Sequence, residues 1–351
     1  MERRALGRGG PEVSALCLGT MTWGSMTDEA EAHRTLDRAL DAGIDFVDAA
    51  EMYPALPGPD DHPGKTEEIL GNWIARTGRR NEIFLATKIT GEGSARARDG
   101  VSPTPMIDAK EIGKALDASL RRLRTDHVDL YQLHWPNRGS YHFRRNWGWA
   151  APAHDRAKEA RDAAEILGAL ARAQEAGKVR EIGLSNETAW GLMLFLDVAE
   201  REGLPRVKAI QNEYSPFCRL FDTDLAEVAR SEGVGLIGYS PLAMGLLTGK
   251  YAGGVVPEGT RRARNPGLNG RVTETFWPAH DGWLALAAER GLDPGEMALA
   301  FCMSRPFMTA PIFGATSAAQ LDLPIRAAGL RLDAETQGAI EALNRRFPMP
   351  F

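Results

Sequence analysis

The chain has 351 residues, of which 42 are lysine or arginine and 47 are aspartate or glutamate, so its formal net charge is −5. This small acidic excess disfavours nucleic acid and anionic membrane surfaces as partners. Apolar residues make up 43% and charged residues 25%, a balance that provides a sizeable core and excludes global intrinsic disorder.

The sequence also favours a reducing compartment. No apolar run approaches the roughly 20 residues needed to cross a bilayer, and the N-terminal residues lack the apolar segment of a secretory signal. Cys17, Cys218 and Cys302 are far apart, with neither metal-type spacing nor a disulfide framework. We therefore expect reduced cysteines, no membrane partner and a cytoplasmic protein.

A hairpin is the first predicted element, because Glu2–Leu6 and Val13–Cys17 flank a glycine-rich turn. Eight short strands are then predicted, each followed by helix-like sequence. They are Ala15–Leu18, Ile44–Asp48, Ile83–Lys88, Val128–His134, Glu181–Leu184, Lys208–Gln211, Val234–Gly238 and Thr309–Phe313. Several are apolar on both alternations, as expected for parallel strands that are covered on both faces.

Capping residues and periodicity identify the intervening helices. Thr27 begins the first of them and Gly43 ends it. A stripe at helical spacing marks another, formed by Ile112, Leu116, Leu120 and Leu123. Asp293 and Ser317 open capping-box sequences, which predict helix starts before and after the eighth strand.

Eight strand–helix units predict an α/β fold in which one closed parallel barrel occupies residues 1–351. No linker or composition shift divides the chain. Long segments follow the fourth and seventh strands, at residues 137–162 and 239–280. Because loops after the strands of such a barrel lie at its C-terminal face, where sites are built, we expect both segments around the mouth.

Four titratable side chains fall at or just after the ends of three neighbouring strands: Asp48, Tyr53, Lys88 and His134. A tyrosine acid needs its pKa of roughly 10 lowered to work near neutrality, and the Lys88 ammonium would favour the phenolate. Asp48 would supply the countercharge of a buried lysine, and His134 a donor for a substrate oxygen. A rim salt bridge, loop packing and a core histidine explain these residues singly, but the set favours function.

Motifs along almost the whole chain resemble the aldo-keto reductase superfamily, with features of its bacterial Tas-like members. They are Asp48–Tyr53, Thr87-Lys88, Leu133–Pro136, Gly183–Asn186, Gln211-Asn212, Tyr239–Leu242, Thr248–Tyr251 and Gly314–Ser317. The resemblance implies a (β/α)8 TIM barrel and NADPH-dependent reduction of an aldehyde or ketone. It makes Tyr53 the general acid, tuned by Lys88 and Asp48, and makes His134 the residue that orients the carbonyl.

Two familiar nucleotide motifs do not account for the cofactor. No Gly-x-Gly-x-x-Gly follows a strand, and the P-loop-like segment Gly245–Tyr251 has three residues between its glycines and no Ser/Thr after the lysine. The resemblance implies that NADPH, in preference to NAD, binds through other residues. These are Gly19, Thr20, Met21, Ser185, Asn186, Gln211, Tyr239, Ser240, Pro241, Leu242, Gly245, Lys250, Arg261, Gly314, Thr316 and Gln320.

The resemblance also divides these residues by role. It places Ser185, Asn186 and Gln211 on the nicotinamide amide, with Tyr239 stacked on the ring. Lys250, Thr316, Gln320 and one arginine near Arg261 would hold the ribose phosphate; Arg262 and Arg264 are alternatives for that arginine. Helix capping is a rival interpretation of Asn186. Pro324 stands where family members usually carry the asparagine that helps to hold adenine.

The substrate and the alternative functions complete the expectations. Trp23 and Trp135, with the aromatic insertion from Tyr141 to Trp149, predict an apolar pocket for a small carbonyl compound. Asp60, Asp61 and His62 lie among prolines and favour a solvated loop, so no metal is expected. A redox-sensing module of the channel β-subunit type is the alternative function, against which His134 argues. The pattern sets no oligomeric state.

Overall fold

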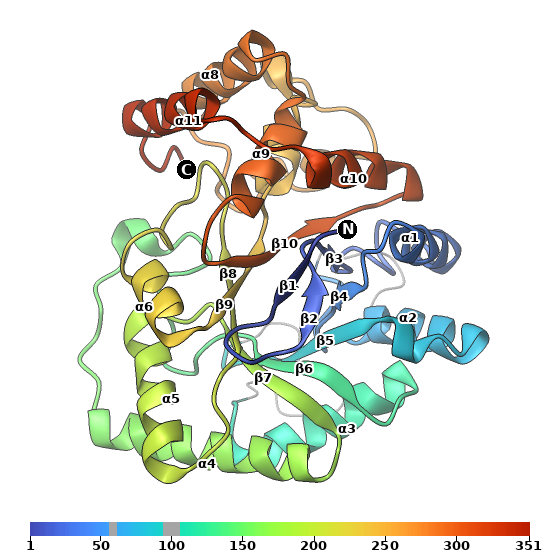
Figure 1. Cartoon of the computed structure of the whole chain (residues 1–351), viewed down its shortest axis with the longest axis vertical. Coiled ribbons are helices and arrows are strands. Elements are labelled where there is room, and N and C mark those ends of the chain that lie inside the picture. The colour runs from blue at the N-terminus through green and yellow to red at the C-terminus, as the bar shows by residue number, and fades with distance from the viewer. Residues whose placement is uncertain (56–61, 94–105) are drawn as a thin grey trace.

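The computed structural model describes residues 1–55, 62–93 and 106–351. Its centre is a closed barrel of eight parallel strands in the order β10-β3-β4-β5-β6-β7-β8-β9. The strands are β3 (Cys17–Gly19), β4 (Phe46–Asp48), β5 (Phe84–Ile89), β6 (Val128–Leu133), β7 (Val179–Ser185), β8 (Ala209–Glu213), β9 (Gly235–Tyr239) and β10 (Met308–Gly314). The predicted (β/α)8 TIM barrel is therefore confirmed (Figure 1).

One helix after each strand covers the outside of the barrel (Figure 1). These helices are α1 (Glu29–Asp41), α2 (Lys65–Thr77), α3 (Ala109–Leu123), α4 (Arg156–Glu175), α5 (Ala189–Glu202), α6 (Asp224–Glu232), α9 (Pro294–Met303) and α10 (Asp322–Gly329). The long segment after β9 adds α7 (Arg261–Arg264) and α8 (Phe276–Glu289), and α11 (Ala334–Arg346) packs beside α8. None of the described helices is long and apolar enough to cross a membrane.

The N-terminal hairpin, β1 (Arg3–Ala5) with β2 (Glu12–Ser14), lies across the end of the barrel that faces the viewer in Figure 1. Leu6 and Val13 are fully buried and join the cluster of side chains inside the barrel. The second hairpin strand is shorter than predicted because the Ser14 hydroxyl donates to Leu16 O and accepts from the Phe46 N–H, which turns the chain into β3.

Two of the predicted helix starts need correction. Asp28, one residue after Thr27, caps α1 by accepting from the Glu31 N–H at 2.8 Å. Ser317 makes no side-chain cap, and a short 3-10 helix (Ala318–Leu321) follows it before α10 begins. Gln320 bonds to Thr316 instead of completing a capping box. The predicted cap at Asp293 is confirmed, since its carboxylate accepts from the N–H groups of residues 295 and 296.

All three cysteines are free and buried. Burial raises the pKa of the Cys17 thiol well above its usual value and that of Cys218 to about 12, and it also raises the pKa of Cys302. Each thiol is therefore protonated at neutral pH and packs as a small apolar group.

Candidate active site

A cavity of about 1530 Å³ opens at the C-terminal end of the barrel. Loops after the strands line it, including parts of both long segments, as expected. Most of the predicted site residues are in its wall: Gly19, Met21, Asp48, Tyr53, His134, Trp135, Asn186, Gln211, Tyr239, Ser240, Pro241, Leu242, Gly245, Lys250, Arg261, Gly314, Thr316 and Gln320. The fold thus brings together residues that are up to 301 positions apart in the chain, from Gly19 to Gln320.

Four predicted site residues lie behind this wall. Lys88 is fully buried beneath Tyr53, and Thr20 donates its hydroxyl to Asp48 O at 2.8 Å. The Ser185 hydroxyl points to Gln211 O, also at 2.8 Å. Trp23, expected in the substrate pocket, has an exposed fraction of 0% and is absent from the lining residues. Of the two tryptophans proposed for that pocket, Trp135 alone lines the cavity.

Lys88 is the centre of the polar cluster at the base of the cavity. Its ammonium donates to Asp48 Oδ2 at 2.6 Å, to Ala49 O at 2.7 Å and to Tyr53 Oη at 3.5 Å. Although burial opposes the charge, Asp48 and Tyr53 raise the pKa of Lys88 above its usual value. The ammonium therefore stays charged beside the phenol oxygen.

The pKa of Tyr53 shifts in the opposite direction to the one expected from the sequence, in which Lys88 lowers it. Burial raises the pKa of the phenol above 10, and the Lys88 ammonium offsets only part of that rise. Tyr53 consequently keeps its proton throughout the neutral range. The adjacent ammonium stabilises negative charge on the oxygen once that proton has left.

Gln132 was not predicted, yet it helps to hold the cluster. Its amide donates to Asp48 Oδ1 at 3.2 Å, and the Gln211 amide donates to the same oxygen at 2.8 Å. Both carboxylate oxygens of Asp48 are therefore bonded inside the barrel. The signal in the sequence was a polar residue two positions before His134, on the strand face that also carries Val128 and Leu130.

His134 lies edge-on to Tyr53, with 5.8 Å between the ring centroids. Burial, followed by the nearby Lys88 charge, lowers the pKa of His134 well below its usual value. The ring is therefore neutral at physiological pH. Its Nδ1 is buried without a hydrogen-bond partner in the described part of the chain, so Nε2 is the nitrogen available to the cavity.

Asn186 and Gln211 offer hydrogen-bond acceptors rather than donors. The Asn186 amide nitrogen donates to His134 O at 2.9 Å and to Ser185 Oγ at 3.1 Å, while its oxygen accepts from Tyr239 Oη at 2.8 Å. Gln211 donates its amide hydrogens to Asp48 and Gln132, which leaves its amide oxygen as the acceptor for a ligand. Asn186 does not cap α5, since Thr188 does so. The remaining lone pairs suit a ligand amide, which donates N–H groups.

Two neighbouring cations in the cavity wall form a candidate anion site. Lys250 and Arg261 both line the wall, and neither side chain makes a hydrogen bond or ion pair within the described residues. Burial lowers the pKa of both groups, and Arg261 lowers that of Lys250 further. Cations that line a cavity without a hydrogen-bonded or ion-paired partner favour an anionic ligand. Together with the amide acceptors and the cavity volume, they fit a dinucleotide with phosphate groups.

Gly245 fixes the approach of Lys250 to this site. Its φ is +94°, a left-handed conformation that favours glycine, and a Cβ there would lie 2.5 Å from Lys250 Cε. Arg262 instead stacks on Tyr251 and Trp277, and Arg264 donates to Ser25 O at 3.1 Å. Among the three clustered arginines, Arg261 is thus the one in the cavity wall.

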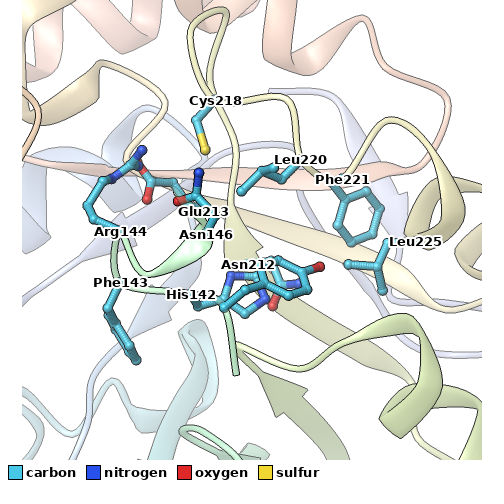
Figure 2. A pocket seen from close by; sticks show the side chains of 11 residues that line it. His142, Phe143, Arg144, Asn146, Asn212, Glu213, Cys218, Leu220, Phe221 and Leu225 are labelled. Atoms are coloured by element: carbon cyan, nitrogen blue, oxygen red, sulfur yellow. The ribbon is translucent and has the colours of Figure 1, made fainter. Parts of the chain in front are cut away.

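Glu213 joins the two long segments at the mouth. Arg271, from the segment after β9, donates to Glu213 Oε1 at 2.8 Å, and Arg144, from the segment after β6, pairs with the same oxygen. Figure 2 shows Arg144 and Glu213 side by side, with the Cys218 sulfur above them. The enclosed space there is only about 10 Å³, about enough for one water molecule, so it is no ligand site.

His142, which also lines this small space, makes the free energy of unfolding depend on pH. Burial lowers its pKa to about 4, so it stays neutral when folded, whereas the unfolded chain binds a proton below about pH 6.5. The contribution of His142 to the free energy of unfolding is complete above that pH. It decreases as the pH falls, by about 2 kcal/mol at pH 5.

We therefore expect His142→Gln to lose about 2 kcal/mol less unfolding free energy than the wild type between pH 7 and pH 5. Glutamine does not titrate and carries an amide donor at the same distance from the backbone as His142 Nε2, which lies 3.2 Å from Glu187 O. Urea denaturation at both pH values measures the difference. Parallel pH dependence in the two proteins would contradict the assignment.

The remaining expectations for the site concern metals and aromatic residues. No group of potential metal ligands occurs within the described ranges. His62 bonds to Glu68, and Asp60 and Asp61 lie outside those ranges. In the aromatic insertion, Phe143 lines the cavity and packs edge-on against Trp135 at 5.8 Å, whereas Trp147 is 65% exposed.

Residues 15–345 match the model of the Aldo/keto reductase family. The chain is 42% identical over 343 residues to Protein tas of Escherichia coli (strain K12), covering 97% of this chain and 96% of that protein. It is 30% identical over 328 residues to the probable voltage-gated potassium channel subunit beta of Oryza sativa subsp. japonica, with coverage of 92% and 89%. Identity is 28% over 353 residues to the NADP(+)-named aldo-keto reductase yakc of Schizosaccharomyces pombe, with coverage of 96% and 92%.

Proposed function

We propose that this chain, which belongs to the aldo/keto reductase family, reduces an aldehyde or ketone to an alcohol with NADPH. The observation that carries this proposal is the buried Asp48–Lys88–Tyr53 cluster beneath His134, at the base of a cavity with an anion site. When bound, NADPH supplies the hydride for the carbonyl carbon. The protein must then position the carbonyl and deliver one proton to its oxygen.

Tyr53 is the proposed proton donor. Its raised pKa keeps the proton on Oη until negative charge develops on the substrate oxygen. Lys88 then stabilises the phenolate from 3.5 Å, and Asp48 keeps the ammonium charged. Proton transfer by a positioned acid typically contributes about 10² to 10⁴-fold to the rate.

His134 is proposed to orient the carbonyl through Nε2. A buried N–H without an acceptor is more costly than an unused lone pair, so a proton on Nε2 is favoured over one on the unpartnered Nδ1. The ring then donates toward the same oxygen that Tyr53 protonates. Asn186, bonded to His134 O, links this position to the proposed nicotinamide amide contacts.

NADP preference is proposed to rest on Lys250 and Arg261, with Thr316 and Gln320 beside the extra phosphate. We expect Arg261→Ala to weaken NADPH binding by about 10 to 100-fold, since a lost charge-assisted hydrogen bond costs roughly 1.5–3 kcal/mol. NADH affinity should change little. Titration of both nucleotides against protein fluorescence measures the two dissociation constants.

Arg264→Ala is the matched control, because Arg264 is exposed and outside the cavity wall. It should bind NADPH as the wild type does. An equal loss of NADH and NADPH affinity in Arg261→Ala would remove Arg261 from the role of phosphate ligand.

The proposed substrate site lies between the catalytic cluster and the aromatic side chains Trp135 and Phe143. Oxidation of NADPH, followed by absorbance with a panel of aromatic and aliphatic aldehydes, tests the function directly. Repeated turnover supports the reductase. Tight NADPH binding without turnover would favour a redox-sensing module, the alternative that the channel-subunit relative represents. With its free, buried thiols, we propose that the protein works in the cytoplasm.

A further inference from the structure

The cavity wall beside the catalytic cluster contains a row of aromatic rings. Trp135 follows His134 directly, with 4.9 Å between their ring centroids, and Phe143 packs edge-on against Trp135 at 5.8 Å. Trp135 is fixed by its indole N–H, which donates to Glu92 O at 2.9 Å. The Phe143 ring has no polar atom to fix it and is 51% exposed, so its position depends on the backbone that carries it.

That backbone is a strained turn. Phe143 and Arg144 are its central residues, and the Arg145 N–H closes it by donating to His142 O at 3.4 Å. The φ angles of Phe143 and Arg144 are +59° and +67°. A left-handed backbone is unfavourable for residues with a Cβ, and glycine or asparagine usually occupies such positions. The turn therefore needs contacts elsewhere to keep its shape.

The side chain of Arg144 provides such contacts. Its guanidinium pairs with Glu213 Oε1 at the end of β8 and lies over the Phe351 ring, with its central carbon 4.6 Å from the ring centroid. Both partners of the ion pair are largely shielded from water, at 12% and 6% exposure. Figure 2 shows Arg144 reaching Glu213 while the Phe143 ring points the other way, so the pair holds the turn with this ring in the cavity wall.

We propose that Arg144 is a positioning residue for substrate selection: anchored on Glu213, it holds Phe143 beside Trp135 and so favours carbonyl compounds that carry an aromatic ring. The proposal rests on the proposed function, because it assumes that the cavity binds a carbonyl substrate. An aromatic substrate would pack against both rings, and edge-on or offset ring pairs are favourable. A small aliphatic aldehyde gains little from this contact.

Arg144→Met removes the anchor but keeps the strain of a left-handed residue with a Cβ. Glu213 retains Arg271, whose Nη2 donates to it at 2.8 Å, so no buried charge is left unpaired and the variant should fold. We expect kcat/KM for benzaldehyde to fall by about 2 to 10-fold relative to kcat/KM for acetaldehyde. Phe143→Ala should change this ratio by the same factor. Steady-state rates with both aldehydes measure the ratio.

The double variant Phe143→Ala with Arg144→Met shows whether Arg144 acts through Phe143. If it does, the double variant has the same benzaldehyde-to-acetaldehyde ratio as Phe143→Ala alone. A further fall in the ratio would mean that Arg144 acts on the substrate directly, which contradicts a positioning role. An unchanged ratio in Arg144→Met, or an equal loss with both aldehydes, would also overturn the proposal.

Arg124→Met is the matched control. Arg124 is exposed, has a φ of +51° and ends α3 just before β6 begins, at the end of the barrel opposite the cavity. The control therefore changes the same residue type at a similar φ. It should keep the wild-type aldehyde ratio.

Hydrogen exchange of the protein without nucleotide or substrate tests the anchor apart from turnover. The amides of residues 145 and 148 donate within the turn and the 3-10 helix that follows it. In Arg144→Met they should exchange about fivefold faster or more than in the wild type, because the turn has lost its charged contact. Unchanged exchange would show that Arg144 does not hold the turn.

The two levels of proposal fail differently. Faster exchange with an unchanged aldehyde ratio rules out the role of Arg144 in selection and leaves the reductase proposal intact. A wild-type protein that binds NADPH but turns over neither aldehyde nor any other carbonyl compound of the panel overturns the proposed function and the selection with it.

Discussion

Replacement of Tyr53 by phenylalanine is expected to lower kcat/KM for carbonyl reduction by about 10² to 10⁴-fold while leaving NADPH affinity unchanged. The substitution removes only the hydroxyl that donates the proton, because Lys88 keeps its bonds to Asp48 and Ala49. Steady-state rates and a nucleotide titration on the same preparation measure the two effects separately. A variant with unchanged turnover would exclude Tyr53 as the acid.

Tyr131→Phe provides a matched control for this experiment. Tyr131 is fully buried on β6 in the layer between the barrel and its helices, away from the cavity wall. The control loses a hydroxyl of the same kind and should retain wild-type kinetics. An equal loss of activity in both variants would indicate damage to the barrel instead of removal of an acid.

Replacement of Lys88 by methionine is expected to reduce both activity and stability. The Asp48 carboxylate would remain buried without its cation, and breaking a buried pair in this way costs about 3–5 kcal/mol. Turnover should fall by at least the factor expected for Tyr53→Phe, because the phenolate loses its stabilising charge. Urea unfolding and initial rates measure the two losses.

The double variant Lys88→Met with Asp48→Asn separates these causes. It removes the uncompensated charge, so most of the lost unfolding free energy should return, and the amides of Gln132 and Gln211 keep an acceptor at Oδ1. Activity should not return, because the ammonium is still missing. Recovery of activity together with stability would show that Lys88 serves the fold alone.

The sequence predicts that the residues of the proposed catalytic cluster lie together, because parallel strands end at a common edge. Asp48, Lys88 and His134 lie at or next to the ends of β4, β5 and β6, so the register of the barrel brings them together whatever their neighbours are. The positions of Lys250 and Gly314 followed in the same way from the loops after β9 and β10.

Side-chain direction was harder to predict, because it depends on contacts between distant segments. Thr20 and Ser185 satisfy their hydroxyls on backbone oxygens of other strands, so they do not reach the cavity. Trp23 is drawn into the core. The sign of the Tyr53 pKa shift also required structure, because it reflects burial, which the sequence does not report.

Glu213 illustrates a second limit. It lies two residues beyond the predicted strand Lys208–Gln211, and its two arginine partners come from long segments whose paths have no periodicity. The same holds for Gln320, whose bond to Thr316 prevents the capping box that its spacing predicts. A local sequence pattern predicts a helix cap correctly only when no nearby group competes for the same hydrogen bond.

Because its three thiols are protonated and buried, the natural protein should react very little with maleimide reagents. A cysteine introduced at an exposed position, such as Trp147 in the segment after β6, would be the one thiol with ready access to solvent. A fluorophore attached there could follow movement of that segment as nucleotide and aldehyde arrive, with no native cysteine removed. Because packing keeps these thiols unreactive, a single introduced label can report motion at the mouth of the barrel.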